Sequence, residues 1–330
     1  MPEQLLLPTH GDQNIFKLGQ IKLKGARNEE VKVKVHFSGI NFADILMRQG
    51  LYPDAPAFPF TPGYEFSGEI IEVGATVKNF KIGDKVFGGC FFGGYSSELN
   101  VPANQVRRLA DNWTLEDGAS LPVSFLTAYV TLFDLARIKN GDKILIDCIT
   151  GSLGGMCIEL LKGIDCDIIG LTSSKSKIQL MLNRGIETYT HDQFYNNKSL
   201  NNFDFILNSQ GGGTITAHYN RLGPAGRIVV VGASSAVAKG KRSLLKAIKM
   251  LFNMPKFKPV QLMNDNKGVM GINALRLFEM PEFLFERLDL AENFDLKFNV
   301  DKIFDAKDVA DAHAYIEDRK SKGKVLLKWN

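Results

Sequence analysis

The second half of the chain alternates short apolar segments with helical ones. The apolar segments have the length of buried strands and lie near residues 143–149, 167–171, 203–208 and 227–232, with a further one near 268–273. Strands that alternate with helices form a parallel sheet that carries helices on both faces. The pattern therefore predicts an α/β fold in which this part of the chain is a doubly wound parallel sheet.

The first part of the chain is richer in strand patterns. In residues 31–35 valine alternates with lysine, which is the period of a strand with one buried face. Similar short runs lie near 68–74, 85–89 and 96–101, and after the sheet a helix near 307–319 and a strand near 324–329 are expected. These last two elements are expected to rejoin the first domain. We therefore predict one domain from residues 1–124 and 274–330, and a second from residues 125–273.

Two helices are predicted from the residues at their ends. Asn41 is a suitable N-cap for a helix over 41–49, and Gly50 would end it. The stretch 114–117 (TLED) resembles a capping box with Asp in the acidic position. A long apolar helix is expected to follow it through Phe133 to Asn140.

Composition narrows the class of protein. The chain has 330 residues, of which 45% are hydrophobic and 23% charged, and its formal net charge is +4. This mild charge favours anionic cofactors without indicating nucleic acid. The four cysteines form no CxxC pair, which is typical of free thiols in a reducing compartment. We see neither a signal peptide nor an apolar run long enough to cross a bilayer, so a cytoplasmic location is expected.

A glycine-containing turn follows the first strand of the predicted parallel sheet. It comprises Gly151, Ser152, Leu153 and Gly154 and opens a helix. Glycine lets the backbone approach a pyrophosphate, which then rests on the amides at the helix N-terminus. The turn could also be an ordinary strand-to-helix connection, because Ser152 departs from the usual glycine. The end of a second strand about 20 residues later favours dinucleotide binding.

The loop after that second strand predicts which dinucleotide is bound. It contains Thr172, Ser173 and Ser174 with Lys175 and Lys177, where an NAD enzyme would place an Asp or Glu on the ribose. Hydroxyl groups and lysines suit the 2′-phosphate of NADPH instead. The alternative is a solvated helix start, in which Ser, Thr and Lys are common.

Five segments carry a resemblance to a known family. They are GINFAD at 39–44, RQGLY at 48–52, LTAY at 126–129, RLGPAGR at 221–227 and GKVLL at 323–327. In this order and spacing they resemble the zinc-independent quinone oxidoreductase branch of the medium-chain dehydrogenase/reductase superfamily, and within it the VAT-1-like proteins. The resemblance implies a GroES-like β-rich catalytic domain and a Rossmann domain, with NADPH in the cleft between them, in a homodimer. It also implies reduction of quinones or α,β-unsaturated carbonyl compounds.

The resemblance also indicates what has replaced the catalytic zinc of the alcohol dehydrogenases. The positions that match the Cys, His and Cys ligands hold Asn41, Tyr64 and Val123. Zinc sites use thiolate, imidazole or carboxylate ligands. An amide, a phenol and an isopropyl group therefore predict that no metal is bound there.

The family's functional residues can be matched one at a time. Asn41 and Tyr52 match positions that face the nicotinamide and substrate. The matched cofactor contacts are Thr127, Lys177 at the 2′-phosphate and Arg319, and Gly232 is a further candidate for cofactor binding. One match fails, because a phosphate-binding tyrosine is expected near Asp192. Tyr64 is either a hydrogen-bond donor to substrate or a packed aromatic of the cleft wall.

We expect direct hydride transfer to an electron-poor carbon, with negative charge collecting on a distal carbonyl oxygen. Conjugation spreads that charge, so the Asn41 amide and the Tyr52 or Tyr64 hydroxyl could stabilise it without a metal. Water could supply the proton.

The stretch 239–258 is basic and apolar at helical spacing. It is interpreted either as a lid helix that packs over the substrate or as a helix for peripheral membrane contact. The second interpretation leads to an alternative function: a VAT-1-like membrane-associated or adaptor protein that keeps the dehydrogenase fold with weak catalysis.

Overall fold

The computed structural model describes residues 1–240 and 242–330, and it divides into two compact units. Unit 1 comprises residues 1–126, 239–242 and 274–330, and unit 2 comprises residues 127–238 and 243–273. These limits differ from the predicted domains at residues 125–126 and 239–242. The latter segment belongs to unit 1 because the Gly240 N–H donates to Glu317 (3.3 Å) and Arg242 contacts His10 (2.8 Å).

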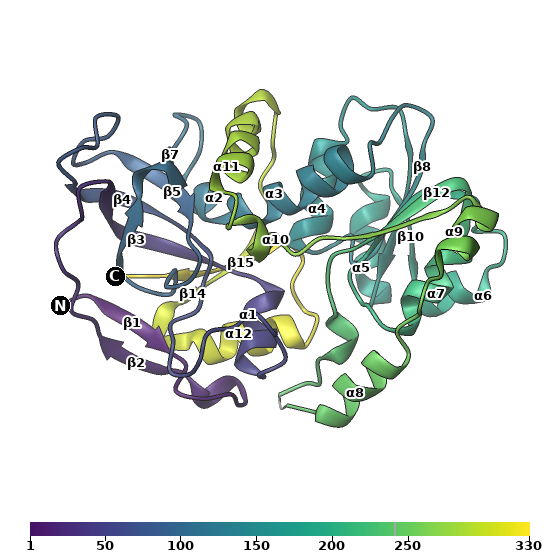
Figure 1. Cartoon of the computed structure of the whole chain (residues 1–330), viewed down its shortest axis with the longest axis horizontal. Helices are drawn as coiled ribbons and strands as arrows, with labels where there is room; N and C mark the ends of the chain where they lie inside the picture. Colours follow the sequence, from purple (N-terminus) through teal and green to yellow (C-terminus); the bar gives the residue numbers. More distant parts are fainter. Residues whose placement is uncertain (241) are drawn as a thin grey trace. The chain divides into compact units, whose positions relative to one another are not determined.

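Unit 2 is built on a six-stranded parallel sheet with the order β10-β9-β8-β11-β12-β13. The strands are β8 (Lys143–Ile146), β9 (Asp167–Thr172), β10 (Glu187–Thr190), β11 (Phe203–Asn208), β12 (Leu222–Val230) and β13 (Gly268–Gly271). The helices are α4 (Ser152–Leu160), α5 (Lys175–Leu182), α6 (His191–Asn196), α7 (Gly213–Tyr219), α8 (Leu244–Phe252) and α9 (Pro259–Asp265). Figure 1 shows helices on both sides of the sheet, with α5 on one and α7 on the other. The predicted α/β fold with a doubly wound sheet is confirmed, although the sequence analysis missed β10.

The apolar strands of unit 2 explain why its sheet is covered on both sides. Ile144, Leu145 and Ile146 of β8 are all fully buried. Consecutive side chains of a strand point to opposite faces, so a strand buried on both faces must be apolar at every position. Strand order reverses between β8 and β11, and ligands of such sheets bind at this point, beyond the carboxyl ends of the strands.

Unit 1 contains a seven-stranded sheet and a separate two-stranded sheet. The strands of the large sheet are β3 (Glu30–Ile40), β4 (Glu65–Val73), β5 (Lys85–Gly89), β6 (Glu98–Pro102), β7 (Val106–Arg108), β14 (Val300–Asp305) and β15 (Lys324–Lys328). The small sheet pairs β1 (Glu3–Leu6) with β2 (Lys17–Gln20). The predicted alternation holds in β3, whose valines at 31, 33 and 35 are buried in the core of unit 1.

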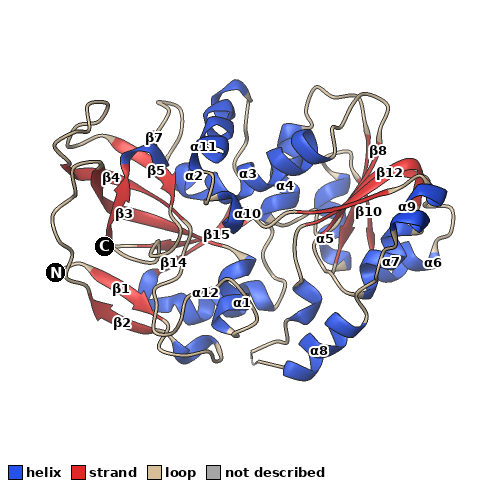
Figure 2. Ribbon diagram, viewed as in Figure 1, coloured by secondary structure: helices blue, strands red, loops and turns tan. Residues whose placement is uncertain are grey.

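The helices of unit 1 are α1 (Phe42–Arg48), α2 (Leu115–Ser120), α10 (Ala274–Leu277), α11 (Pro281–Asp289) and α12 (Val309–Glu317), while α3 (Pro122–Tyr129) begins in unit 1 and ends in unit 2. Helix α2 lies against β4 and β5 (Figure 2). In the described parts of the chain, no helix has the length and apolar character needed to cross a bilayer.

Of the two helix predictions, one is corrected and one is confirmed. The long helix predicted up to Asn140 is instead α2, α3 and a π-helical stretch over Val130–Leu135. The break falls between Ser120 and Pro122, because proline lacks the backbone N–H that would continue the hydrogen bonds of α2, although Leu121 itself keeps helical dihedral angles. Asn41 is the N-cap of α1 as predicted, and its N–H donates to the Asp44 carboxylate at 2.8 Å as in a capping box. The Asn41 side chain also bonds Glu65 and Lys324.

Candidate functional site

The turn predicted to hold a pyrophosphate connects β8 to α4 in unit 2. Gly151 is the N-cap of α4. Because glycine has no side chain, the N-cap residue does not hydrogen-bond the first amides of that helix through a side chain. Ser152 and Leu153 are its first two residues. At Gly154 a Cβ atom would lie 2.5 Å from the Ile149 Cα, so only glycine allows the helix to approach the strand this closely. The turn thus has the geometry of an anion site at a helix N-terminus.

The second predicted cofactor segment follows β9. Thr172 is the last residue of this strand and is 1% exposed, whereas Ser173 is exposed. Ser174 is the N-cap of α5, and its Oγ lies 2.8 Å from the Ser176 Oγ. Of the two lysines considered for the 2′-phosphate, Lys177 is 6% exposed while Lys175 is exposed. Lys175 is therefore the more accessible cation of this loop.

Two more predicted cofactor residues belong to unit 2. Gly232 follows β12, and a Cβ atom there would lie 2.8 Å from the carbonyl oxygen of Ser209, which follows β11. Thr127 lies in α3 and is 9% exposed. Arg319 belongs instead to unit 1, just after α12, with a left-handed φ of 57°. The structure thus gathers the turn at Gly151, the loop at Thr172 and Gly232 at the carboxyl ends of parallel strands.

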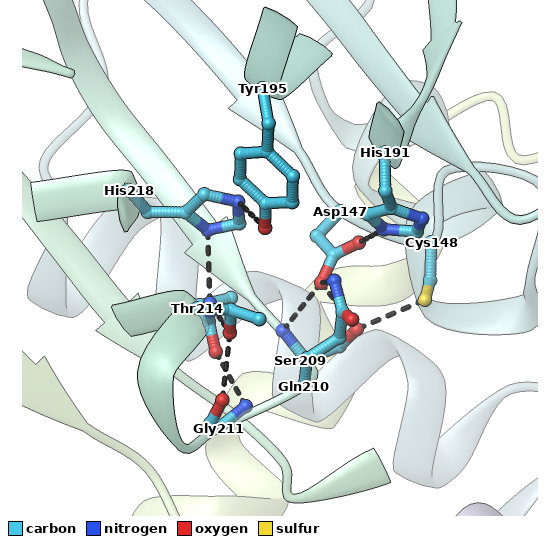
Figure 3. A network of polar contacts seen from close by, with 10 residues as sticks. Asp147, Cys148, His191, Tyr195, Ser209, Gln210, Gly211, Thr214 and His218 are labelled. Carbon is cyan, nitrogen blue, oxygen red and sulfur yellow. Dashed lines mark hydrogen bonds and ion pairs between the residues drawn. The ribbon is translucent and has the colours of Figure 1, made fainter. Parts of the chain in front are cut away.

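Sequence reasoning missed a network that ties these loops together (Figure 3). Its centre is Asp147, directly after β8, which is 1% exposed. One carboxylate oxygen lies 2.8 Å from the His191 Nε2, and the other accepts from the N–H and Oγ of Ser209 and from Gln210. Burial alone would raise the pKa of Asp147, but the hydrogen bond and charge of His191 outweigh it and lower the pKa to about 2. Asp147 is therefore an ionised anchor for the loops after β8, β10 and β11.

A second part of the network is centred on His218 (Figure 3). The His218 Nδ1 lies 2.9 Å from the Asn208 Nδ2, an obligate donor, so this ring nitrogen accepts and Nε2 carries the hydrogen toward the Tyr195 hydroxyl at 3.3 Å. Burial lowers the pKa of His218 to about 4, so the ring is neutral at pH 7. Asn208 also accepts from the Gly211 N–H at 2.8 Å, which shapes the loop after β11.

The position of Asp147 offered the only sequence signal for this network. An acidic residue directly after an apolar strand and before a glycine turn either faces solvent or is buried with several donors. His191 and Ser209 carry no signal of their own, since they meet Asp147 only because β10, β8 and β11 end at the same edge of the sheet, with β9 between β10 and β8.

In unit 1 the predicted catalytic residue Asn41 belongs to a buried polar cluster. Its Nδ2 donates to the Glu65 carboxylate (2.8 Å), and its Oδ1 accepts from the Lys324 ammonium (2.8 Å). Lys324 also forms an ion pair with Glu65, and both side chains are at most 2% exposed. The other Glu65 oxygen accepts from the Val123 N–H at 2.8 Å. The three positions that match zinc ligands thus lie around Glu65. Glu65 directly follows Tyr64 in the chain, and its carboxylate accepts hydrogen bonds from Asn41 and Val123.

A second buried carboxyl group lies beside this cluster. Asp44 is fully buried, and its Oδ2 accepts from the Asn41 N–H and from the Tyr95 hydroxyl at 3.0 Å. Its Oδ1 has no hydrogen-bond partner among the described residues. Burial raises the pKa of Asp44 to about 7, since these two hydrogen bonds only partly offset it. Asp44 therefore exchanges its proton near neutral pH.

Tyr52 and Tyr64 share an apolar cluster with Met47, Phe60 and Phe92. Tyr64 is 4% exposed, and its hydroxyl lies 3.2 Å from the Met47 sulfur. Burial raises the pKa of Tyr64 far above its usual value, so the phenol stays protonated. The packing and the hydroxyl's contact with sulfur favour the wall-aromatic interpretation of Tyr64. In the described chain, no group of three or more His, Cys, Asp or Glu side chains is placed to hold a metal.

Comparisons with known proteins agree with this architecture. Residues 27–111 match the family model of the alcohol dehydrogenase GroES-like domain, and residues 184–327 match that of zinc-binding dehydrogenases. The chain is 30% identical over 308 residues to the human synaptic vesicle membrane protein VAT-1 homolog, covering 90% of this chain and 78% of that protein. It is also 30% identical over 315 residues to the bovine quinone oxidoreductase-like protein 2, covering 90% and 84% respectively.

The fold is shared with a solved enzyme structure. The Escherichia coli quinone oxidoreductase complexed with NADPH superimposes with a TM-score of 0.83 at 22% identity, over 99% of this chain and all of the other. The chain is therefore an oxidoreductase of the medium-chain dehydrogenase/reductase superfamily and belongs to the branch of the quinone oxidoreductases and VAT-1 homologues.

Proposed function

We propose that this chain is an NADPH-dependent reductase of quinones or α,β-unsaturated carbonyl compounds that works without zinc. The observation that carries the proposal is the cluster at the matched metal positions. An amide, a buried phenol and a backbone N–H surround Glu65 there, and the cation beside it is the Lys324 ammonium. A cationic side chain so close would repel a divalent metal ion.

The choice of NADPH rests on unit 2. Gly151 to Gly154 form the turn at the N-terminus of α4, which packs closely on Ile149 at Gly154, and the first amides of such a helix would bind a pyrophosphate. The loop after β9 offers hydroxyl groups and the exposed Lys175, and no carboxylate follows Thr172 directly. A 2′-phosphate would find donors and positive charge in that loop.

Conjugated carbonyl compounds suit a site that lacks a metal. Bound NADPH would supply a hydride for the β-carbon of an enone or for a quinone, and the displaced electron pair would collect on the carbonyl oxygen. Asn41 and Tyr52 can donate hydrogen bonds to that oxygen. Water then supplies a proton, which completes the saturated ketone; a quinone takes a hydride and a proton to become a hydroquinone.

The test combines cofactor binding with turnover. Titration with NADPH and with NADH, followed by fluorescence, measures cofactor preference. NADPH oxidation is then recorded with a quinone and an enone, before and after chelation, and zinc content is measured. We expect turnover that is insensitive to chelation and that falls about 100-fold in Asn41→Ala. Turnover that requires stoichiometric zinc would overturn the metal-free mechanism, and failure of every conjugated carbonyl to oxidise NADPH would overturn the reductase.

A second candidate function, contact with a membrane surface, is favoured by helix α8. Five of its apolar side chains are exposed: Leu244, Leu245, Ile248, Leu251 and Phe252. Residues 239–258 contain seven Lys or Arg, and no Asp or Glu occurs between Asp204 and Asp265. Lys241 in this stretch lies outside the described residues. An exposed apolar face flanked by cations fits the surface of a bilayer that contains anionic lipid.

Vesicle flotation tests this second function. We expect the chain to float with vesicles of phosphatidylcholine and phosphatidylserine but not with phosphatidylcholine alone, and to be released by salt. Replacing Leu245 and Phe252 by Ser should abolish flotation. Ile82→Ser is the matched control, because Ile82 is 66% exposed but lies in unit 1, away from α8 in sequence. Equal flotation of both variants would contradict the assignment to α8.

A further inference from the structure

We propose that Lys324 and Glu65 are positioning residues that hold the Asn41 amide in one orientation, so that it presents an N–H, and not its carbonyl oxygen, to the substrate oxygen. The inference rests on the proposed function and specifies how a site without zinc is organised. It concerns unit 1 alone, because all three residues belong to that unit.

The chemistry of the two partners decides the orientation of the amide. The Lys324 ammonium can only donate, so the Asn41 atom 2.8 Å from it must be the oxygen. The Glu65 carboxylate can only accept, so the atom 2.8 Å from it must be the nitrogen. Turning the amide by half a rotation would place oxygen against oxygen and nitrogen against nitrogen. Both contacts would then be repulsive.

The surroundings hold Glu65 itself in place. Its second oxygen accepts from the Val123 N–H at 2.8 Å, so both oxygens of the carboxylate are used. Gly39 leaves the room that this side chain needs, because a Cβ atom there would lie 2.5 Å from Glu65 Oε1. The backbone of Asn41 is anchored separately through Asp44. The amide is thus held at both ends by groups that are themselves buried and hydrogen-bonded.

One hydrogen of the Asn41 amide is left over. The Nδ2 group carries two hydrogens, and Glu65 takes one. The other has no acceptor within the described residues, while Asn41 is partly exposed. Lys324 further polarises the amide, since a cation on the carbonyl oxygen strengthens the N–H as a donor. The ammonium therefore contributes, through Asn41, some of the positive potential that a metal would supply directly.

The test is a mutant cycle around Asn41. The double variant Lys324→Met with Glu65→Gln removes both charges together and keeps the side-chain volumes similar, which avoids an unpaired buried charge. We expect its kcat to fall by up to about 100-fold with an unchanged KM for NADPH. In the Asn41→Ala background the same double change should cause no further loss of kcat, because the side-chain amide through which it acts is absent. Additive losses would overturn the proposal.

A matched control separates positioning from stability. Arg48 and Glu317 form another buried ion pair in unit 1, with side chains at most 2% exposed. Replacing that pair by Met and Gln is expected to lower the melting temperature without a selective loss of kcat. An equal loss of kcat in the control would show that any buried ion pair of unit 1 matters in this way, which would overturn the specific role of Lys324.

A readout that does not depend on turnover distinguishes this inference from the proposed function. The side-chain amide signal of Asn41 can be assigned in an asparagine-labelled NMR spectrum by its absence in Asn41→Ala. In the double variant we expect that signal to shift and its hydrogens to exchange faster with solvent. If the wild type reduces no quinone or enone yet the signal shifts, the proposed function fails and the positioning stands. An unchanged signal overturns the positioning in either case.

Discussion

Two buried aspartates, one in each unit, behave in opposite ways. Asp44 in unit 1 and Asp147 in unit 2 are both at most 1% exposed. Burial raises the pKa of Asp44 to about 7, while the pKa of Asp147 is lowered to about 2 in spite of burial. Burial therefore does not by itself decide the charge of these carboxyl groups.

The difference lies in the hydrogen bonds that each carboxyl group receives. Both oxygens of Asp147 are used, by His191, Ser209 and Gln210. Asp44 receives two hydrogen bonds on one oxygen only, and these bonds together with the nearby Lys324 charge only partly offset the rise in pKa that burial causes. In unit 2 the Asp147 carboxylate stays ionised at neutral pH and holds the loops after β8, β10 and β11 together. The cluster of unit 1 contains the Asp44 carboxyl group, whose pKa of about 7 means that it gains or loses its proton near neutral pH.

The largest expected effect is on the pH dependence of stability in unit 1. The pKa of Asp44 is raised on folding, so its contribution to stability is fully present below the unfolded value near 3.8 and is lost as pH rises toward about 7. An Asp44→Asn variant lacks this loss. Relative to wild type it should therefore gain roughly 4 kcal/mol of unfolding free energy between pH 4 and pH 8. Both tryptophans, Trp113 and Trp329, lie in unit 1, so urea unfolding followed by their fluorescence measures it.

A difference between variant and wild type that stays constant with pH would show that Asp44 is ionised in the folded state at all these values. Both aspartates would then be ionised in the folded protein, and the difference between them would disappear.

The next effect is the loss of the anchor in unit 2. Asp147→Ala leaves the His191 ring, the Ser209 hydroxyl and the Gln210 amide without their acceptor. We expect about 3 kcal/mol of destabilisation at pH 7. Circular dichroism monitors the urea transition, since unit 2 contains no tryptophan. Asp167→Ala is the control, because that carboxylate is exposed on β9; equal losses would mean that Asp147 has no special role.

A smaller effect concerns the turn that the anchor supports. Gly154→Ala places a Cβ atom 2.5 Å from the Ile149 backbone, whereas Gly155→Ala in the same helix meets nothing within 4 Å. We expect the first to cost about 2 kcal/mol and to weaken NADPH binding. The second should stabilise α4 by about 0.5–1 kcal/mol. Isothermal titration and urea unfolding measure the two quantities, and similar behaviour of both variants would contradict the close approach at Gly154.

The smallest effect appears in acid. The pKa of Asp147 is lowered on folding, so its contribution is present above pH 3.8 and is lost as pH falls through about 2. Between pH 4 and pH 2 the wild type should lose roughly 1–2 kcal/mol more than Asp147→Asn. This direction is opposite to that expected for Asp44. A parallel pH profile of the two proteins would indicate that His191 does not hold the carboxylate ionised.

Five strands of the parallel sheet, the strands β3, β4, β5, β6 and β15 of unit 1 and the turn at Gly151 were predicted, because they rest on local patterns of hydrophobicity and glycine. The short strands β1, β2, β7, β10 and β14 were missed. The break at Pro122 was also encoded locally and was overlooked. The partners of Asn41 were not predictable, since Lys324 lies 283 residues away and Asn41 itself was expected to cap a helix.

Sequence alone determined the order of most elements, the glycine turn after β8, the polar loop after β9 and the lack of the usual zinc ligands at positions 41, 64 and 123. Only the tertiary structure decided what those positions hold instead, and which buried carboxyl group keeps its proton. The reason is physical: periodicity follows from neighbours in the chain, whereas a pKa or the orientation of an amide depends on donors and charges that distant strands bring within about 3 Å.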